Sequence, residues 1–183
     1  MNEFDIIRDL FAPLSENAAG AFALRDDAAL IDQGAYIVTK DMMIAGVHFR
    51  PKDPLDLVAR KLIRVNLSDL AAKGAKPIGY FLACAWPQTI KPASVELFAA
   101  GLQEDQETYR IALFGGDTTA HAAKAAPLTL SATFFGAPPK QGMTLRSGAG
   151  AGDDLYVTGT IGDAGLGLKA LSKEEKFSTV DKA

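Results

Sequence analysis

The sequence predicts an α/β (α+β) protein in which helices cover a mixed or antiparallel β-sheet. Apolar runs of strand length are intermingled with longer segments that carry apolar residues at helical spacing. Glycine and proline residues separate these segments, as they do between regular elements. Apolar residues make up 48% of the 183 residues, enough for one globular core, or for one domain and part of a second. Strands and helices mixed in this way pack as a sheet with helical layers.

The first predicted elements lie before residue 45. Apolar residues at helical spacing predict a short helix over 4–11, and a run of small and polar residues over 14–25 predicts a loop. Two short strands are predicted at 28–32 and 35–40. Gln33-Gly34 between them suits a tight hairpin.

Two long helices follow. Asp53-Pro54 predicts an N-cap followed by proline at the first helical position, and Gly74 predicts the end of that helix. Pro92 predicts the start of the second helix, which ends near Tyr109. The other predicted elements are four strands and a final helix, at 78–86, 111–114, 127–136, 155–159 and 163–171.

The last predicted strand and helix indicate a second structural unit. They are followed by a polar segment without a clear period. We therefore expect residues 1–150 to form one domain and residues 151–183 to be the start of a truncated second domain.

Charge and cysteine content exclude several classes of protein. The net charge of −3 and the pI of about 5.4 give no basic surface for nucleic acid. The single cysteine, Cys84, excludes an intrachain disulfide framework. The N-terminal residues do not have the pattern of a signal peptide, and the longest apolar run, 78–86, is too short to span a bilayer. The sequence thus predicts a cytoplasmic protein with no nucleic-acid or membrane partner.

Four carboxylates lie at comparable places in the predicted elements. Asp27 precedes a predicted strand, Asp41 and Asp117 follow predicted strands, and Asp69 lies in a helix, three residues after Asn66 on the same face. One aspartate at a strand end is an ordinary turn residue. Four of them beside Gly, Thr and Ser suit a hard cation such as Mg²⁺, which binds carboxylates and hydroxyls and shares them with phosphates.

The glycines before Asp117 agree with a phosphate site. Gly115-Gly116 would let the backbone approach a bulky anion closely. The sequence contains neither a P-loop nor a Rossmann glycine motif with its acidic residue, so a nucleotide would bind by another route. Cys84, inside an apolar run, is predicted to be a core residue and not a nucleophile.

Five motifs, in this order and spacing, resemble the thiamine-monophosphate kinase family. They are DDAAL (26–30), VTKDMMIAGVHF (38–49), VNLSDLAAKGAKP (65–77), FGGDTT (114–119) and LRSGAGAGDDLYVTGTIGDAGLGL (145–168). The resemblance implies the N-terminal domain of the aminoimidazole ribonucleotide synthetase-like fold, which forms homodimers through its sheet. It also implies ATP-dependent phosphorylation of thiamine monophosphate to thiamine diphosphate by in-line transfer. Several Mg²⁺ ions would assist, and no catalytic side chain would be needed, because the attacking oxygen is already anionic.

The resemblance also implies roles for individual residues. The implied metal ligands are Asp27, Thr39, Asp41, Asp69 and Asp117. The implied ATP-binding residues are Tyr109, Gly116, Asp117 and Arg146, and His48 would contact thiamine monophosphate. For Tyr109 and His48 a purely structural role is the alternative. The chain departs from the usual family pattern at four positions, Arg25, Lys40, Arg110 and Ala120.

Two other functions are compatible with the sequence. The chain could be another ATP-dependent enzyme of the same superfamily, or a non-catalytic module that dimerises and binds nucleotide. Because the second domain is short, we expect the chain to keep the dimer interface and part of the Mg²⁺–nucleotide site, with weak or no kinase activity of its own.

Overall fold

The structure, a computed structural model, describes residues 2–18, 23–24, 36–144 and 148–172. The chain divides into two compact units, Met1–Leu145 and Arg146–Ala183, and each is described by itself. Asp27, Arg25, the predicted strand at 28–32 and its hairpin lie outside the described residues, as does Arg146.

The N-terminal helix predicted over 4–11 is confirmed. It begins with α1 (Glu3–Ile6) and continues as a π-helical turn, η1 (Ile7–Phe11), and a 3-10 turn, η2 (Ala12–Ser15). Phe11 and Leu14 are buried in the main core, so this segment packs its apolar side onto the first unit.

Both long helices are confirmed as α2 (Leu55–Ala72) and α3 (Pro92–Tyr109). The start of α2 differs slightly from the prediction, because Pro54 takes the N-cap position. Asp53 instead accepts hydrogen bonds from the backbone N–H and the guanidinium of Arg50, at 2.8 Å each. The helix ends as predicted before Gly74, after which the Ala75 N–H donates back to the Leu70 carbonyl at 2.9 Å.

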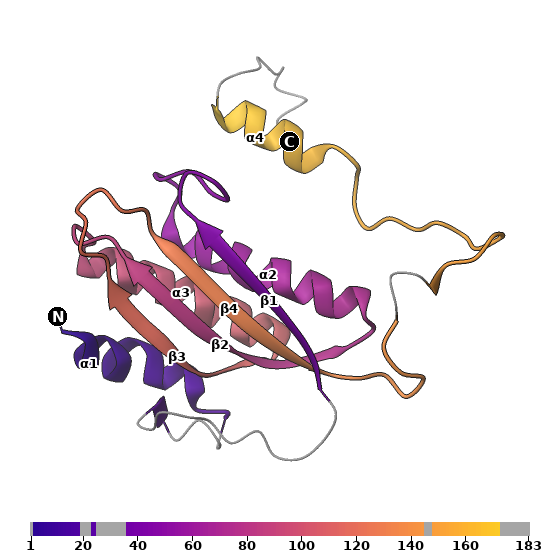
Figure 1. The fold of residues 1–183 in the computed structure, drawn as a ribbon, viewed down its shortest axis with the longest axis horizontal. Coiled ribbons are helices and arrows are strands. Elements are labelled where there is room, and N and C mark those ends of the chain that lie inside the picture. Colours follow the sequence, from indigo (N-terminus) through magenta and orange to yellow (C-terminus); the bar gives the residue numbers. More distant parts are fainter. Residues whose placement is uncertain (1, 19–22, 25–35, 145–147, 173–183) are drawn as a thin grey trace. The chain divides into compact units, whose positions relative to one another are not determined.

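A mixed sheet forms the other layer of the first unit, as predicted. Its strands in the described part of the chain are β1 (Ile37–Ile44), β2 (Lys76–Trp86), β3 (Ala112–Ala120) and β4 (Thr129–Ala137). Their spatial order is β1-β4-β2-β3, with β4 antiparallel to β1 and to β2, and β3 parallel to β2 (Figure 1). Strands β1 and β3 therefore form the two edges.

Two strands extend beyond their predicted ends. The strand predicted at 35–40 continues to Ile44, and the strand predicted at 111–114 continues to Ala120. Both are extended because they stay paired with a neighbour, β1 with β4 and β3 with β2. Asp41 and Asp117 consequently lie within strands and not after them, which corrects the sequence-based interpretation.

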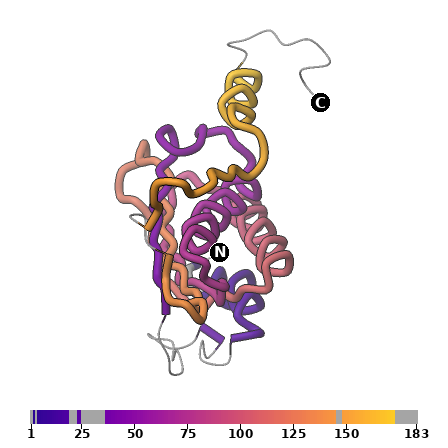
Figure 2. Tube along the Cα trace, turned by 90° about the vertical axis from the view of Figure 1, so that its right-hand side faces the viewer, coloured from indigo at the N-terminus to yellow at the C-terminus, as the bar shows by residue number. Residues whose placement is uncertain are grey.

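The helices α2 and α3 lie together on one face of this sheet (Figure 2). Alternate strand residues point into the space between the layers, where Tyr80, Leu130 and Phe134 are fully buried. Cys84 is buried there too, and burial raises the pKa of its thiol, as expected for a core residue without a reactive role.

The described part of the second unit has little buried surface of its own. Helix α4 (Asp163–Ser172) confirms the final predicted helix, but the strand predicted at 155–159 is wrong. A strand needs a hydrogen-bonded neighbour, and within the described ranges none pairs with this segment. Leu155 is 97% exposed and Tyr156 is 86% exposed.

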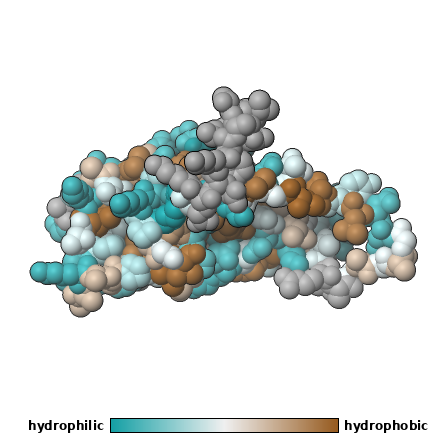
Figure 3. All heavy atoms as spheres, turned by 90° about the horizontal axis from the view of Figure 1, so that it is seen from above, coloured by the Kyte–Doolittle hydropathy of each residue, from teal (hydrophilic) through white to brown (hydrophobic). Residues whose placement is uncertain are grey.

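On the face of the molecule seen in Figure 3, apolar and polar residues are interspersed.

Candidate functional site

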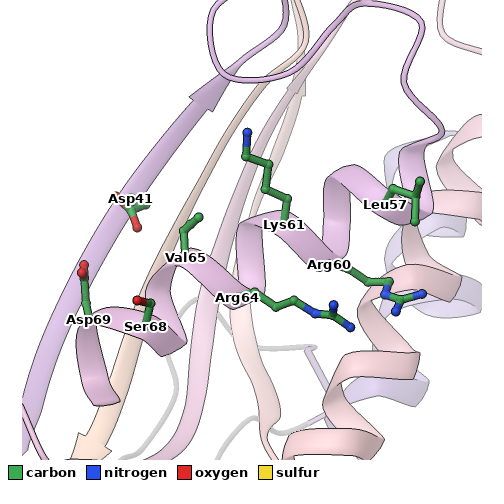
Figure 4. A pocket seen from close by; sticks show the side chains of 8 residues that line it. All are labelled: Asp41, Leu57, Arg60, Lys61, Arg64, Val65, Ser68 and Asp69. Atoms are coloured by element: carbon green, nitrogen blue, oxygen red, sulfur yellow. The ribbon is translucent and has the colours of Figure 1, made fainter. Parts of the chain in front are cut away.

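Two carboxylates and one hydroxyl meet where β1 passes the C-terminal end of α2. Thr39 and Asp41 occupy alternate positions of β1, so both side chains point toward the helix layer. The Thr39 hydroxyl donates a hydrogen bond of 2.9 Å to the Asp69 carboxylate. Figure 4 shows the Asp41 and Asp69 carboxylates pointing toward one another across the gap between strand and helix. We call Thr39, Asp41 and Asp69 the acidic edge.

Lys40 lies between two residues of the acidic edge in sequence but not in space. It is exposed, and strand alternation places its side chain on the face away from α2. It pairs with Thr133 of β4, whereas Asp41 pairs with Ala132, which is buried on the helix side. The ammonium therefore leaves the carboxylate pair available for another cation.

The charges of the acidic edge repel each other. Partial burial raises the pKa of Asp41, and the like charge of Asp69 raises it further, while His48 acts in the opposite direction. A bound cation would relieve this repulsion, and carboxylate and hydroxyl oxygens are the donors that Mg²⁺ prefers. The residues present thus fit a magnesium ion, although no three Asp, Glu, His or Cys side chains of the described residues are grouped closely enough to hold one by themselves.

A pocket of about 670 Å³ adjoins the acidic edge. It is lined by Asp41, Leu57, Arg60, Lys61, Arg64, Val65, Ser68 and Asp69. All except Asp41 come from α2 (Figure 4). Lys61, Val65 and Ser68 are spaced by four and three residues, so they follow one face of the helix. The pocket is therefore a strip along α2 with two carboxylates at its C-terminal end.

The three cationic side chains of the pocket differ in what they bind. Arg64 donates two hydrogen bonds of 2.8 Å to Asp105 of α3, whose side chain is completely buried. Arg60 lies 3.1 Å from Glu104 and 3.7 Å from Asp105. Figure 4 shows both guanidinium groups directed toward the neighbouring helix. These two residues join α2 to α3 and stabilise the helix that carries Asp69.

Lys61 contacts the turn that carries His48. Its ammonium group donates a hydrogen bond to the His48 carbonyl oxygen. The turn follows β1 and needs Gly46, which has a φ of +84°. The His48 ring is exposed, and its Nδ1 accepts a hydrogen bond of 3.0 Å from the Ile44 N–H, which leaves Nε2 directed away from the backbone. His48 is thereby held near the pocket, in a place where it can meet a ligand.

The residues Gly115, Gly116 and Asp117, which we call the glycine edge, lie elsewhere. They belong to β3, at the other edge of the sheet from β1. Three strand spacings of roughly 4.8 Å separate these edges, or about 14 Å. Asp117 pairs with Ala83 and is exposed, while its neighbour Thr118 is buried and accepts a 2.8 Å hydrogen bond from the Trp86 indole.

The two edges also face opposite sides of the sheet. Asp41 lies in one cross-strand row with Ala132, Leu82 and Gly116. Asp117 is the next residue after that row, so its side chain projects from the face opposite to Asp41. Within one chain, Asp117 cannot share a cation with Asp41 and Asp69. The structure brings together only part of the predicted ligand set.

The other predicted site residues are placed as follows. Tyr109 ends α3 and is 38% exposed, so it is available to a ligand and is not a core residue. Asp27 and Arg146 lie outside the described residues. Ala120, one of the positions that departs from the family pattern, is the last residue of β3. Arg110, another of them, adopts a left-handed conformation at the C-cap of α3, with a φ of +54°.

Of the eight residues that line the pocket, only Asp41 and Asp69 are predicted from the sequence, and the polar residues Lys61 and Ser68 are among those that were missed. The signal that could have found them is helical spacing, because Lys61, Val65 and Ser68 are four and three residues apart and Asp69 is four residues after Val65. Sequence patterns alone did not show that this side of the helix borders β1.

No helix among the described residues is long and apolar enough to cross a membrane.

Comparisons with known proteins agree with this fold. Residues 25–137 match the family model described as AIR synthase related protein, N-terminal domain. The chain is 52% identical over 171 residues to a thiamine-monophosphate kinase of Caulobacter vibrioides, which covers 92% of this chain and 48% of the relative. The chain thus spans about half the length of the curated relatives it matches.

Solved structures show the same similarity. A crystal structure of thiamine-monophosphate kinase from Stenotrophomonas maltophilia is 35% identical, with a TM-score of 0.74 over 95% of this chain and 54% of its own. The structure of AaThiL complexed with AMPPCP and TMP is 27% identical, with a TM-score of 0.72 over 98% of this chain and 55% of its own.

Proposed function

We propose that this chain, which belongs to the AIR synthase related protein family, is the magnesium- and ATP-binding part of a thiamine-monophosphate kinase. The family model that it matches is that of the N-terminal domain. The observation that carries the proposal is the acidic edge beside the pocket on α2. An all-oxygen site of this kind suits a reaction in which charged phosphates must be brought together.

The proposed reaction transfers the γ-phosphoryl group of ATP to the phosphate of thiamine monophosphate. The bond between the γ-phosphorus and the β–γ bridging oxygen breaks, ADP leaves with that oxygen, and a new phosphoanhydride bond forms thiamine diphosphate. The attacking phosphate oxygen is already anionic, so the protein has no proton to remove from it. Catalysis then depends on placing the two reactants in line and on neutralising their negative charge.

The roles of the residues follow from their places. Thr39, Asp41 and Asp69 would hold Mg²⁺, with Asp27 as a further ligand in the proposal, and the metal would neutralise phosphate charge. Asp41 and Asp69 each present a carboxylate to the pocket. His48 would contact thiamine monophosphate, because its ring is exposed on a turn that Lys61 joins to the pocket helix.

The ATP-binding part of the proposal rests on residues outside the pocket. Tyr109, Gly116, Asp117 and Arg146 would contact ATP, and Asp117 would also be a metal ligand. Support comes from the relative AaThiL, complexed with AMPPCP and TMP, which covers nearly all of this chain. Since Asp117 faces away from Asp41 within one chain, its part in a shared metal site depends on a second copy.

A homodimer is therefore included in the proposal. It would form through the sheet face opposite α2 and α3, which carries a half-buried cluster of the Phe81, Phe114 and Phe135 rings. On β1 the same face exposes Val38 and Met42. Apolar surface of this kind is typical of interfaces between copies of a chain.

We also propose the domain roles and the location. Residues 1–150 would be the ATP- and magnesium-binding and dimerisation domain, and residues 151–183 the start of a second domain. A cytoplasmic location agrees with the single buried cysteine, which suits a reducing compartment.

Calorimetry tests the proposal. The chain is titrated with Mg²⁺ and then with AMPPCP in the presence of Mg²⁺. We expect both to bind, and we expect weak or no formation of thiamine diphosphate by this chain in a separate assay with ATP and thiamine monophosphate. Absence of any Mg²⁺ binding would overturn the metal assignment. Binding without any transfer, even in a whole-length relative, would favour the non-catalytic alternative.

A further inference from the structure

We propose that Lys61 binds a phosphate group beside the metal at the acidic edge. This inference rests on the proposed function, and it adds a phosphate-binding residue to the proposed site. The chemical class of its ligand is a phosphate monoester or the terminal phosphate of a nucleotide.

Among the described residues, Lys61 is the pocket cation with no carboxylate within ion-pair distance. The pKa of Asp53 is lowered mainly by Arg50, and Lys61 adds a weaker contribution from a greater distance. Arg64 is held by the buried Asp105, and Arg60 by Glu104 and Asp105. Ion pairs within 4.0 Å are found for both arginines, and none is found for Lys61 in the described part of the chain. Among the described cations of the pocket, Lys61 is thus the one that no carboxylate holds in an ion pair, so its charge can act on an anionic ligand.

Lys61 also has hydrogen-bonding capacity left for a ligand. An ammonium group has three N–H donors. In the described part of the chain, one of them is used on the His48 carbonyl oxygen. This contact holds Nζ at the pocket, and the other two donors are available to phosphate oxygens.

The position of Lys61 along α2 also suits a phosphate ligand. Lys61 precedes Asp69 by eight residues on the same side of the helix, which is a rise of about 12 Å. A lysine side chain extends about half of that distance and is seen in Figure 4 leaving the helix toward the strand side. A phosphate lying between its ammonium and a cation at Asp41 and Asp69 would be neutralised from both ends, as phosphoryl transfer requires.

The contact with His48 connects this phosphate to the proposed acceptor. Lys61 joins α2 to the turn that presents the His48 ring, so one side chain would bind the phosphate and position the residue proposed to contact the thiamine group. This arrangement points to the phosphate of thiamine monophosphate as the source, with the γ-phosphate of ATP as the other source to be distinguished.

The experiment compares three variants of the chain by calorimetry at a fixed Mg²⁺ concentration. Lys61→Met removes the charge, Lys61→Arg keeps it, and Lys91→Met removes one charge from the exposed position before α3. The ligands are thiamine monophosphate, unphosphorylated thiamine and AMPPCP. We expect Lys61→Met to weaken thiamine monophosphate binding about ten- to a hundredfold, the effect of losing a hydrogen bond to a charged group.

The pattern across ligands separates phosphate binding from a structural role. We expect unphosphorylated thiamine to bind the Lys61→Met variant unchanged, Lys61→Arg to restore most of the affinity, and Lys91→Met to have no effect. A loss confined to AMPPCP would assign the phosphate to the nucleotide. Equal losses for thiamine and its monophosphate, or no loss for either phosphate ligand, would overturn the inference.

Mg²⁺ binding measured without any phosphate ligand separates this inference from the proposed function. It should depend on Asp69 and be unchanged by Lys61→Met. If the unmodified chain binds no Mg²⁺, the proposed function fails. If Mg²⁺ binding is intact and Lys61→Met binds the phosphate ligands normally, only the role of Lys61 fails.

Discussion

The two edges of the sheet carry similar residues but are built differently. At the acidic edge, a regular strand and the end of a long helix place Thr39, Asp41 and Asp69 around one point, next to a pocket. At the glycine edge, β3 begins after a left-handed Arg110, its register against β2 shifts, and Asp117 is exposed on the opposite face of the sheet. An aspartate in a glycine-rich motif is therefore not by itself part of a metal site. Whether it can bind a metal depends on the face of the sheet from which its side chain projects and on the residues beside it.

The largest expected effect comes from adding a side chain at the glycine edge. A Cβ atom on Gly116 would lie 1.7 Å from the Leu82 carbonyl oxygen, so Gly116→Ala forces β3 away from β2. We expect the free energy of unfolding of the chain to fall by about 3 kcal/mol, as for severe overpacking. Urea denaturation measures it. Gly148→Ala, where nothing lies within 4 Å of an added Cβ, is the control and should change little.

A neutral isostere at the acidic edge should act on binding and not on folding. Asp69→Asn removes one of the two carboxylates that face each other, and we expect Mg²⁺ affinity to fall about a hundredfold. The matched variant is Asp117→Asn at the glycine edge. At concentrations where ultracentrifugation shows a monomer, this variant should bind Mg²⁺ like the unmodified chain. An equal loss in both variants would mean that the two edges contribute to one site within a single chain.

A smaller effect is expected from the hydroxyl of the acidic edge. Thr39→Val keeps the shape of the side chain and removes its 2.9 Å hydrogen bond to Asp69. Such a bond contributes about 1 kcal/mol, so Mg²⁺ affinity should fall about fivefold. Calorimetry at constant ionic strength measures the change. Thr129→Val, on a strand of the same sheet but outside the pocket, should leave the affinity as it is.

The smallest effect concerns the entry to the glycine edge. Arg110 has a φ of +54°, a conformation that costs a residue with a side chain about 1 kcal/mol and costs glycine nothing. Because glycine also loses more chain entropy on folding, we expect Arg110→Gly to stabilise the chain by about 0.5 kcal/mol. Thermal unfolding monitors this gain. Ala100→Gly, inside the same helix, should destabilise by about 1 kcal/mol, and a loss in both variants would refute the conformational explanation.

The sequence predicted the helices and the central strands well because their signals are local. The periodic apolar residues of α2 and α3, with Pro92 and Gly74 near their ends, fix these helices without knowledge of the rest of the fold. The pairing of β1 with β4 and of β3 with β2 is not local. The sequence therefore predicts a strand that ends at Phe114, although pairing with β2 carries the strand through Gly115 and Gly116.

The candidate site was predicted in part for the same reason. Asp41 and Asp69 come from motifs that are recognisable in the sequence, and the structure places them together. Strand alternation already places Lys40 opposite Asp41. The face on which Asp117 lies depends on the register of β3 against β2, which the motifs do not contain. Lys61 was missed because its meaning depends on which side of α2 borders β1.

Paramagnetic broadening by Mn²⁺ in place of Mg²⁺ tests the location of the metal site most directly. Mn²⁺ is added at a low ratio to the isotopically labelled, monomeric chain, and the loss of backbone amide signals is followed by NMR. Because we place the metal at the acidic edge, we expect the strongest broadening at residues 39–41 and 68–69, and we expect Asp69→Asn to abolish it. Broadening centred instead on residues 115–119 of β3, unchanged by Asp69→Asn, would contradict a metal site at the acidic edge.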